Sequence, residues 1–359
     1  MAAEKTLTPR AGELYSHTAI RGIAALCVVG YHAVLGSAGK GYTDNPIQNL
    51  FLTSFIFVDF FFILSGFIMF ENYGKKIAGP TALTNILQYW KKRFLKILPN
   101  YYFWLFVAVA FSLLNWTYFG NRTASNACLA GSFLKHLVLA QNLVGSCHYF
   151  NTPLWSIAVE MIAYFVFPVV IMLRLGWGTT LLIGISLYAV LFRYSETIDI
   201  IDGYNSVLRC LAGFLCGVAA AKITFKILPD TIQLTLVASL IAAICLNYQL
   251  AALCLMFVVT ISTAQNTGIL AKVSKMTIPY LIGRSSFSIY LAHIPVAMVI
   301  RTIAYKFETV TGIPFGSDWK IITPLEILAS CVVGTLAYLH VEKRFERIVA
   351  KSSTLFQAA

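Results

Sequence analysis

The sequence predicts an all-α, polytopic membrane protein with about ten transmembrane helices and both termini in the cytoplasm. Of its 359 residues, 58% are hydrophobic and 12% are charged, about half the charged share of a soluble globular protein. The mean hydropathy is +0.74, and apolar residues are spread over the whole chain rather than gathered in one segment. This composition excludes a soluble domain, a disordered chain, a collagen-like chain and a coiled coil.

Ten apolar stretches of about 15 to 25 residues are long enough to cross the hydrocarbon core of a bilayer. They lie near residues 18–38, 50–70, 99–117, 153–173, 178–192, 206–221, 231–247, 250–265, 279–300 and 321–339. A shorter apolar stretch at 133–144 is expected to form a re-entrant or interfacial helix over the outer mouth. Because no linker or low-complexity tract separates the stretches, residues 1–359 are expected to form a single transmembrane domain.

The basic residues are divided unevenly between the two sides of the predicted bundle. The chain has 27 Lys and Arg against 15 Asp and Glu, a net charge of +12. An even number of spans puts both termini on one side, which then holds 19 of the 27 basic residues. Since basic residues collect in cytoplasmic loops, both termini are predicted to be cytoplasmic. The same asymmetry explains the basic excess without a nucleic-acid partner, and the first span is expected to act as an uncleaved insertion signal.

The eight cysteines give little evidence of chemistry. Six lie in or at the ends of apolar spans, where Cys usually packs as a small hydrophobic residue. Cys128 and Cys147 both lie in the long outer segment 118–152, which faces an oxidising compartment if the membrane is a bacterial inner membrane. A disulfide and two free thiols remain alternatives for this pair. The Cys and His spacings match no zinc site, so no metal is expected.

Ionisable residues inside apolar spans are costly and are therefore functional candidates. Arg21 and His32 are eleven residues apart in the first span, so both lie on one helix face roughly 16 Å apart. A guanidinium at the cytoplasmic interface and a deep imidazole suit a ligand with phosphates at one end and a reactive group on a long arm, the shape of a coenzyme A thioester. The alternative is that Arg21 sets topology and His32 packs.

A carboxylate lies midway along the second span, at Asp59, and it needs a partner in the membrane. Gly66 follows on the same helix face, where a neighbouring helix can approach closely. Two roles remain open for Asp59. The carboxylate either orients Arg21 or His32, or it forms a structural hydrogen bond to another span.

The start of the fourth span also carries polar residues. Asn151 and Trp155 precede Glu160, and Ser156, Glu160 and Tyr164 share one helix face. An aromatic residue at this depth is most often a membrane anchor. With Asn151 and Glu160 beneath it, the alternative is that Trp155 stacks on a sugar ring at the outer mouth.

Two further polar segments stand out. In the ninth span, Ser286, Tyr290 and His293 share a face, and such a row either joins helices or lines a site. The basic segment 91–96 precedes Pro99 at the start of the third span. It favours a cytoplasmic position, and a second role in binding cofactor phosphates is the further hypothesis.

Taken together, five segments resemble acyltransferase family three, the integral membrane O-acyltransferases. Residues 21–32 are similar to the family's Arg-x10-His motif, and residues 58–67 to its second-span signature. The basic segment 93–99, the fourth-span segment 151–160 and the ninth-span segment 283–293 also resemble family motifs, in the family's order.

Two positions depart from the family's pattern. Lys96 stands where a second Arg is expected, and the family usually continues into Pro where this chain has residues 342–344. Lysine keeps the charge at position 96 but loses the bidentate geometry of a guanidinium.

The resemblance implies transfer of an acyl group, usually acetyl from acetyl-CoA, to a hydroxyl of a cell-surface or exported carbohydrate at a bacterial inner membrane. Our expected mechanism places His32 as general base or acyl carrier, with Glu160 or Asp59 orienting it. The expected binding residues are Arg21, Arg93 and Lys96 for the coenzyme A phosphates, and Asn151, Trp155, Tyr290 and His293 for the acceptor.

A secondary transporter is the alternative function, because it also needs many spans and charges near the midplane. Transporters of this kind are often built from repeats that contain broken helices. We find no internal repeat, and no pair of Gly- or Pro-broken spans recurs in the two halves. The enzyme is therefore the favoured interpretation.

Overall fold

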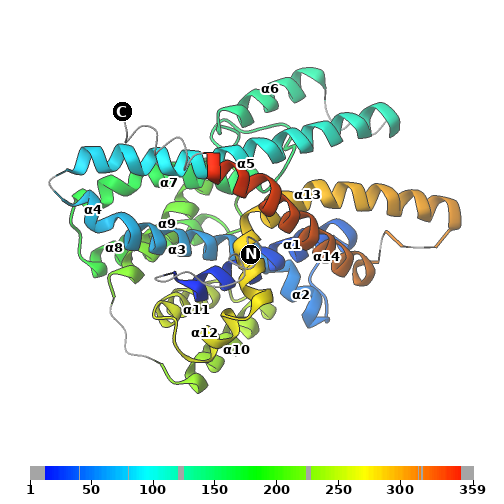
Figure 1. Ribbon diagram of the computed structural model, residues 1–359. Helices are drawn as coiled ribbons and strands as arrows, with labels where there is room; N and C mark the ends of the chain where they lie inside the picture. Colours follow the sequence, from blue (N-terminus) through cyan, green and yellow to red (C-terminus); the bar gives the residue numbers. More distant parts are fainter. Residues whose placement is uncertain are drawn as a thin grey trace.

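The computed structural model describes residues 13–39, 41–79, 81–119, 125–223, 228–313, 315–316 and 318–348 (Figure 1). Within these ranges the chain is helical and contains no strand, so the all-α prediction is confirmed. The α-helices are α1 (Tyr15–Ala38), α2 (Pro46–Leu52), α3 (Phe57–Met69), α4 (Lys75–Ile77), α5 (Ala82–Phe119), α6 (Asn126–Leu137), α7 (Leu154–Met172), α8 (Trp177–Tyr194), α9 (Gly203–Ala221), α10 (Asp230–Cys245), α11 (Gln249–Thr263), α12 (Gly268–Ser274), α13 (Thr277–Thr311) and α14 (Trp319–Ala337). A 3-10 helix, η2 (Ser54–Ile56), and two π-helices, η3 (Phe70–Gly74) and η4 (Tyr338–Glu342), continue or join them.

Every predicted span coincides with a helix, and the polytopic membrane architecture is confirmed. In the described ranges, eight helical segments are long and apolar enough to cross a membrane. The number rises to nine if α11 and α12, which meet at 80°, form one broken span. Helix α10 has 16 residues and is therefore about 24 Å long, shorter than the roughly 30 Å hydrocarbon core. Among the described residues there are thus eight or nine candidate full-length spans and one shorter apolar helix, α10, in place of the ten apolar stretches.

Two helices are longer than the sequence pattern predicted. Helix α5 has 38 residues and begins at Ala82 rather than near residue 99, so the basic segment 91–96 is helical. Helix α13 has 35 residues and continues to Thr311. In Figure 1 the last turns of both helices extend beyond the rest of the bundle on the same side. Both helices contain an internal proline and continue through it.

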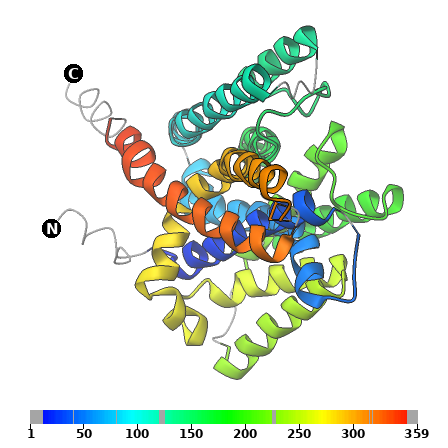
Figure 2. The same ribbon diagram turned by 90° about the vertical axis from the view of Figure 1, so that its right-hand side faces the viewer.

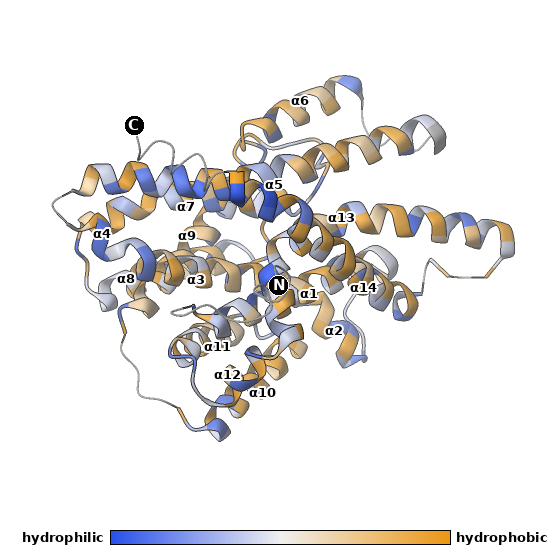
Figure 3. Cartoon of the chain, in the orientation of Figure 1, coloured by the Kyte–Doolittle hydropathy of each residue, from blue (hydrophilic) through white to orange (hydrophobic). Residues whose placement is uncertain are grey.

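The bundle is built around α1, α3, α9, α13 and α14, which pack extensively on one another. Apolar residues run along most helices, and hydrophilic residues gather around α4 and at points along the first half of α5 (Figure 3). Close backbone contact between α1 and α13 depends on two glycines. A Cβ atom at Gly22 would lie 2.7 Å from the Gly283 nitrogen, and one at Gly283 would lie 2.2 Å from the Thr18 carbonyl oxygen.

Helices α3 and α9 also touch through glycines. A Cβ atom at Gly66 would lie 2.0 Å from the carbonyl oxygen of Phe214, and one at Gly217 would lie 1.9 Å from that of Ile63. The expected close approach of a helix at Gly66 is therefore confirmed, and the helix is α9. Small residues at such crossings permit van der Waals contact between backbones, which drives helix association in lipid.

A buried ion pair joins the same two helices. Asp59 and Arg209 both have fully buried side chains, and Arg209 Nη2 lies 2.7 Å from Asp59 Oδ2. Arg209 Nε donates to both carboxylate oxygens, at 3.1 and 3.2 Å, and the Tyr188 hydroxyl donates to Oδ1 at 3.1 Å. Arg209 Nη1 and Nη2 also donate to the carbonyl oxygens of Ile200 and Phe55. Both charges thus have hydrogen-bond partners within the protein.

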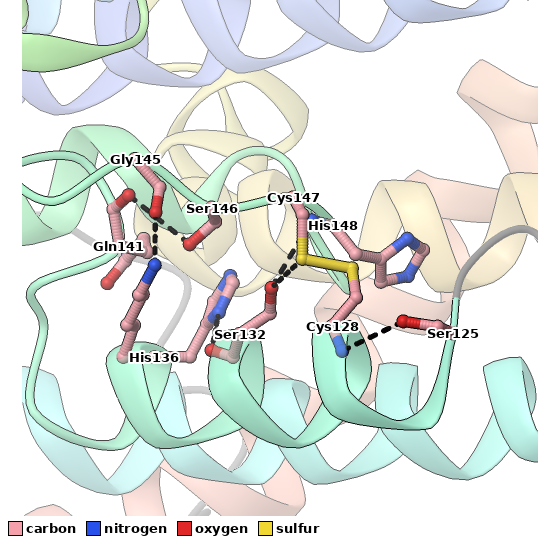
Figure 4. The surroundings of a disulfide bond; sticks show 10 residues. Ser125, Cys128, Ser132, His136, Gln141, Gly145, Ser146, Cys147 and His148 are labelled. Atoms are coloured by element: carbon pink, nitrogen blue, oxygen red, sulfur yellow. Dashed lines mark hydrogen bonds between the residues drawn. A yellow bond between two sulfur atoms is a disulfide. The ribbon is translucent and has the colours of Figure 1, made fainter.

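The outer segment forms α6 and a loop closed by a disulfide. Cys128 of α6 is bonded to Cys147, with Cα atoms 5.9 Å apart (Figure 4). Helix α6 begins before the predicted apolar stretch 133–144 and packs along α5 (Figures 1 and 2). The hydroxyls of Tyr101 and Tyr102 donate to the carbonyl oxygens of His136 and Leu137. Since structural disulfides persist in oxidising compartments, the bond favours an outer position for this segment.

We predict that removing one charge of the buried ion pair lowers the stability of the protein more than removing both charges. Arg209→Met should lower stability by about 3–5 kcal/mol because Asp59 keeps a buried charge without a partner, and Asp59→Leu in the same chain should recover most of the loss. Thermal unfolding in detergent checks this. Lys272→Met is the control, because its 3.7 Å pair with Asp230 is exposed. Additive losses in the double variant would contradict the prediction.

The cytoplasmic position of the termini is tested by cysteine accessibility, in a background that lacks the exposed Cys254. A cysteine replacing Lys91, which is exposed on α5, should react only when a maleimide reaches the cytoplasm. One replacing Glu196, exposed between α8 and α9, should react with an impermeant maleimide added outside intact cells. The reverse pattern would invert the topology.

Candidate active site

A cavity of about 550 Å³ runs from one end of the bundle toward its middle. The helices α1, α3, α5, α7 and α13 form its walls together with the π-helices η3 and η4. Its polar lining residues are Glu13, Thr18, Arg21, Ser65, Asn72, Tyr73, Arg93, Lys96, Ser156, Glu160, Tyr164, Arg284, Ser286, Tyr290, Tyr338, Glu342 and Glu346. Its wide end therefore lies at the predicted cytoplasmic side, where α1 begins and α14 ends.

The three residues predicted to bind phosphate come together at this wide end. Arg21, Arg93 and Lys96 all line the cavity. Arg93 Nη2 donates to the Tyr73 hydroxyl at 3.0 Å, and the guanidinium lies 5.2 Å from the Tyr73 ring. Arg21 and Lys96 make no hydrogen bond or ion pair with the described residues. Two cations that have no ion pair with the described residues make this end suitable for a polyanion.

Arg284, which the sequence analysis missed, is a further cation at the same end. Arg284 donates to the hydroxyls of Tyr338 and Tyr280, at 2.9 and 3.4 Å, and its Nη1 lies 3.8 Å from Glu13 Oε2. The Tyr280 hydroxyl donates to the same carboxylate at 2.7 Å. Arg284 belongs to the ninth-span motif and lines the cavity. Unlike Arg21, it already has a carboxylate partner.

Both π-helices lie beside this cavity. The π-helix η3 contributes Asn72 and Tyr73 to its wall, and η4 contributes Tyr338 and Glu342. A π-helical turn inserts an extra residue, which re-aims the side chains that follow, and such turns are frequent at functional sites. The Glu342 carboxylate accepts from the Ser288 hydroxyl at 2.7 Å. The π-helices therefore shape the wide end of the cavity.

The deep end of the cavity is lined by hydroxyls and one carboxylate. The Tyr164 hydroxyl donates to Glu160 Oε1 at 2.6 Å and lies 2.9 Å from the Ser65 hydroxyl. The Ser156 and Tyr290 hydroxyls are 2.9 Å apart. The predicted shared face of Ser156, Glu160 and Tyr164 is thus confirmed, and Glu160 bonds to Tyr164 rather than to His32.

His32 lies behind Tyr290 and not in the cavity wall. The His32 and His293 rings have centroids 4.9 Å apart, and the Tyr290 ring lies 5.8 Å from that of His293. Nδ1 of His32 lies 3.3 Å from Nε2 of His293. The sequence analysis assigned His293 to the acceptor; the structure instead places its ring against His32.

An ion pair holds the backbone of α1 at His32. Arg301 donates from Nε and Nη2 to the two oxygens of Glu326, at 2.7 and 3.0 Å, and from Nη2 to the carbonyl oxygen of His32 at 2.7 Å. Gly36 makes room for this contact, because a Cβ atom there would lie 1.7 Å from Arg301 Nη1. The position of His32 is therefore set from α13 and α14 as well as from its own helix.

The assignment of Asp59 requires a correction. Of its two alternative roles, the structure supports the structural contact with another span and not the orientation of Arg21 or His32. Asp59 bonds to Arg209 and Tyr188 and has no hydrogen bond to His32 or Arg21. A catalytic role in orienting His32 is thus without support. Arg209 was missed as the partner. It is a cation inside a predicted apolar span, and this was the available signal.

Asn151 and Trp155 also require correction, since both are buried and neither lines the cavity. The Trp155 ring lies 5.2 Å from the Arg209 guanidinium and packs edge-on against Phe62, so it is not free to stack on a sugar. Asn151 Nδ2 donates to the carbonyl oxygen of Leu291 at 2.9 Å. Of the four predicted acceptor residues, only Tyr290 lines the cavity.

The hydrogen bond from Asn151 to the Leu291 carbonyl is explained by Pro295 in α13. Pro295 has no N–H to donate to the carbonyl four residues earlier, which is that of Leu291. The Asn151 amide takes its place. Helix α7 shows the same solution, since Pro168 frees the Tyr164 carbonyl, and Trp90 Nε1 donates to it at 3.1 Å.

A second, mostly apolar cavity of about 340 Å³ lies near the outer side, between α5, α6 and α13. Phe133, Phe150 and Met298 are among its lining residues, together with His148. Burial lowers the pKa of His148, so its ring is neutral at neutral pH. It shares no lining residue with the first cavity, the one lined by Arg21, Arg93 and Lys96, which we call the basic cavity.

We predict that Asn151 stabilises α13 rather than binding the acceptor. Asn151→Ala should lower stability by about 1–3 kcal/mol because the Leu291 carbonyl loses its donor. Adding Pro295→Ala should restore most of that loss, since an alanine supplies the missing N–H. Thermal unfolding of the two single variants and the double variant checks this. Equal losses with and without Pro295 would show that the contact has no such role.

Comparison of the sequence with known proteins identifies similar acyltransferases. Residues 14–339 match a family model described as an acyltransferase domain, that of acyltransferase family three. The chain is 28% identical over 171 residues to the acyltransferase MdmB of Streptomyces mycarofaciens, covering 45% of this chain and 40% of that protein. It is 24% identical over 163 residues to the peptidoglycan O-acetyltransferase OatA of Listeria monocytogenes serovar 1/2a, covering 44% of this chain and 24% of that protein.

The matches thus span less than half the length of each relative. No solved structure matches the chain. The family model, in contrast, runs from the start of α1 into η4 and includes all lining residues of the basic cavity except Glu13, Glu342 and Glu346. The chain belongs to acyltransferase family three.

Proposed function

We propose that this protein is a membrane O-acyltransferase that moves an acyl group, acetyl in the first instance, from cytoplasmic acyl-CoA to a hydroxyl of a cell-surface or exported carbohydrate. The observation that carries the proposal is the basic cavity. Arg21 and Lys96 at its wide end have no ion pair with the described residues, and the Tyr290 ring in its wall contacts the His293 ring of the histidine pair. The name of the Listeria relative, a peptidoglycan O-acetyltransferase, supports a carbohydrate acceptor and an acetyl group.

The donor is proposed to enter from the cytoplasm with its phosphates near Arg21, Arg93 and Lys96. A cavity of about 550 Å³ has the size of a small-molecule site. The roughly 16 Å along α1 between Arg21 and His32 is a distance that a pantetheine arm can cover. Tyr290 lines the cavity and its ring lies 5.8 Å from that of His293. Its hydroxyl is held by Ser156 alone among the described residues. We propose that rotation of this ring admits the thioester carbonyl.

In the proposed reaction, His32 acts as a general base on the acceptor hydroxyl. Its Nε2 takes the hydroxyl proton while the oxygen attacks the thioester carbon and forms the new C–O bond. The C–S bond then breaks, and the imidazolium returns the proton to the leaving sulfur. General base catalysis of this kind contributes about 10²–10⁴-fold. Glu160, which lines the cavity and bonds to Tyr164, is proposed to bind donor or acceptor groups rather than to orient the imidazole.

A transporter is the second candidate, because the bundle also contains a polar cavity between its helices. The bent pair α11 and α12 has no counterpart in the other half of the described chain, which speaks against a transporter built from repeats.

By analogy with its bacterial relatives, we also propose that the protein lies in the inner membrane. Residues 1–359 are proposed to form one transmembrane domain.

Labelling in membrane vesicles tests the function directly. Inverted vesicles containing the protein, supplied with acetyl-labelled acetyl-CoA, should give covalently labelled glycan. His32→Ala vesicles should give none, because the residue that takes the proton is missing, although the variant still inserts. A transporter would give no covalent label in either case. Turnover of His32→Ala within about tenfold of the wild type would remove His32 from the mechanism.

We expect Arg21→Lys to weaken coenzyme A binding without abolishing turnover at saturation. A lysine ammonium keeps the charge but loses the planar, bidentate geometry that suits phosphate. Binding of coenzyme A to the purified variant should show a raised Kd, by isothermal titration. Lys92→Met, on the same predicted side but not lining the cavity, is the matched control. An unchanged Kd for Arg21→Lys would leave Arg21 with a topological role only.

A further inference from the structure

A second histidine faces the histidine of the proposed mechanism. His293 is 1% exposed and reaches His32 from α13. The two carboxylates predicted to orient His32 are engaged elsewhere: Asp59 is held by Arg209, and Glu160 by Tyr164. The side chain from another helix that lies within hydrogen-bond distance of the His32 ring is instead the imidazole of His293.

The neutral form of each ring follows from its backbone contacts. His293 Nδ1 lies 2.6 Å from the carbonyl oxygen of Tyr290, and His32 Nδ1 lies 3.1 Å from that of Val28. A carbonyl oxygen only accepts hydrogen bonds, so Nδ1 carries the hydrogen in both neutral rings. The lone pair of each ring is then on Nε2.

The contact between the two rings fits these forms. Nε2 of His293 has a lone pair and lies 3.3 Å from Nδ1 of His32, which has a hydrogen. The hydrogen bonds therefore run in one direction, from His32 to His293 and from His293 to the Tyr290 carbonyl. The Val28 carbonyl is a weak partner for His32 by itself, because it is also the helical acceptor for the His32 backbone N–H. Nε2 of His32 accepts no hydrogen bond from the described residues.

We propose that His293 is a positioning residue that holds His32 in the tautomer whose Nε2 is the basic atom. This inference rests on the proposed function, in which Nε2 of His32 takes the proton of the acceptor hydroxyl. The Nδ1 hydrogen stays on His32 throughout. When His32 becomes an imidazolium, its bond to the neutral His293 becomes charge-assisted and therefore stronger. The proton on Nε2 then passes to the leaving sulfur, and both rings return to their starting forms.

Two substitutions in the full-length protein separate this role from packing. In His293→Gln the amide oxygen can accept from Nδ1 of His32, whereas His293→Leu fills the space without an acceptor. We expect His293→Leu to lower kcat by about 10²-fold, and His293→Gln to stay within about tenfold of the wild type, with the thioester KM little changed in both. Equal losses in the two variants, or a loss confined to KM, would overturn the inference.

His17→Leu is the matched control for removing a buried imidazole from the bundle. His17 is fully buried on α1, and its Nε2 lies 2.9 Å from the carbonyl oxygen of Thr260 rather than near the histidine pair. It should change thermal unfolding but leave kcat within about threefold. A loss of kcat as large as that of His293→Leu would mean that any such deletion disturbs the site.

A readout without turnover separates the inference from the proposed function. Nitrogen-15 NMR of the protein labelled at histidine reports which ring nitrogen carries hydrogen, and loss of a signal in His32→Gln assigns it. We expect the Nδ1–H form of His32 in the wild type and in His293→Gln, and a mixture of forms in His293→Leu. An Nε2–H form in the wild type would overturn the inference. If the tautomer depends on His293 but His32→Ala still transfers acyl groups, the proposed role of His32 fails instead.

Discussion

Lipid offers no hydrogen bonds, so every polar group in the bundle has to find its partner in the protein. Asp59 and Arg209 illustrate the rule, since the pair makes six hydrogen bonds, with each other, with the Tyr188 hydroxyl and with two backbone carbonyl oxygens. The carbonyls freed by Pro295 and Pro168 illustrate it again, with donors from Asn151 and Trp90. These contacts fix which helices are neighbours, and the glycine crossings then set how closely they pack.

The basic cavity is the part of the bundle where that rule is relaxed. Arg21 and Lys96 have no ion-pair partner among the described residues, whereas Arg209, Arg284 and Arg301 each have a carboxylate within 4 Å. A cation without a partner is tolerated where water or a ligand reaches it. The contrast between paired and unpaired arginines therefore marks the surface on which a charged donor is proposed to bind.

Near the deep end of the cavity, residues of neighbouring helices hold His32 in position. Arg301 holds the carbonyl of His32, Gly36 leaves space for that guanidinium, and His293 contacts the ring. None of these groups belongs to the same helix as His32 except Gly36. These contacts fix the position of the His32 ring, and proton transfer depends on such geometry.

The sequence by itself determined the class of the protein, the places of the helices and the residues worth considering. Hydropathy finds spans because a helix satisfies its own backbone, whatever its neighbours. The Arg21–His32 spacing and the shared face of Glu160 and Tyr164 follow from one helix alone. Partners between helices do not, because no periodicity states which span meets which. Only the tertiary structure decided that Asp59 meets Arg209, that Trp155 is buried, and that His293 meets His32.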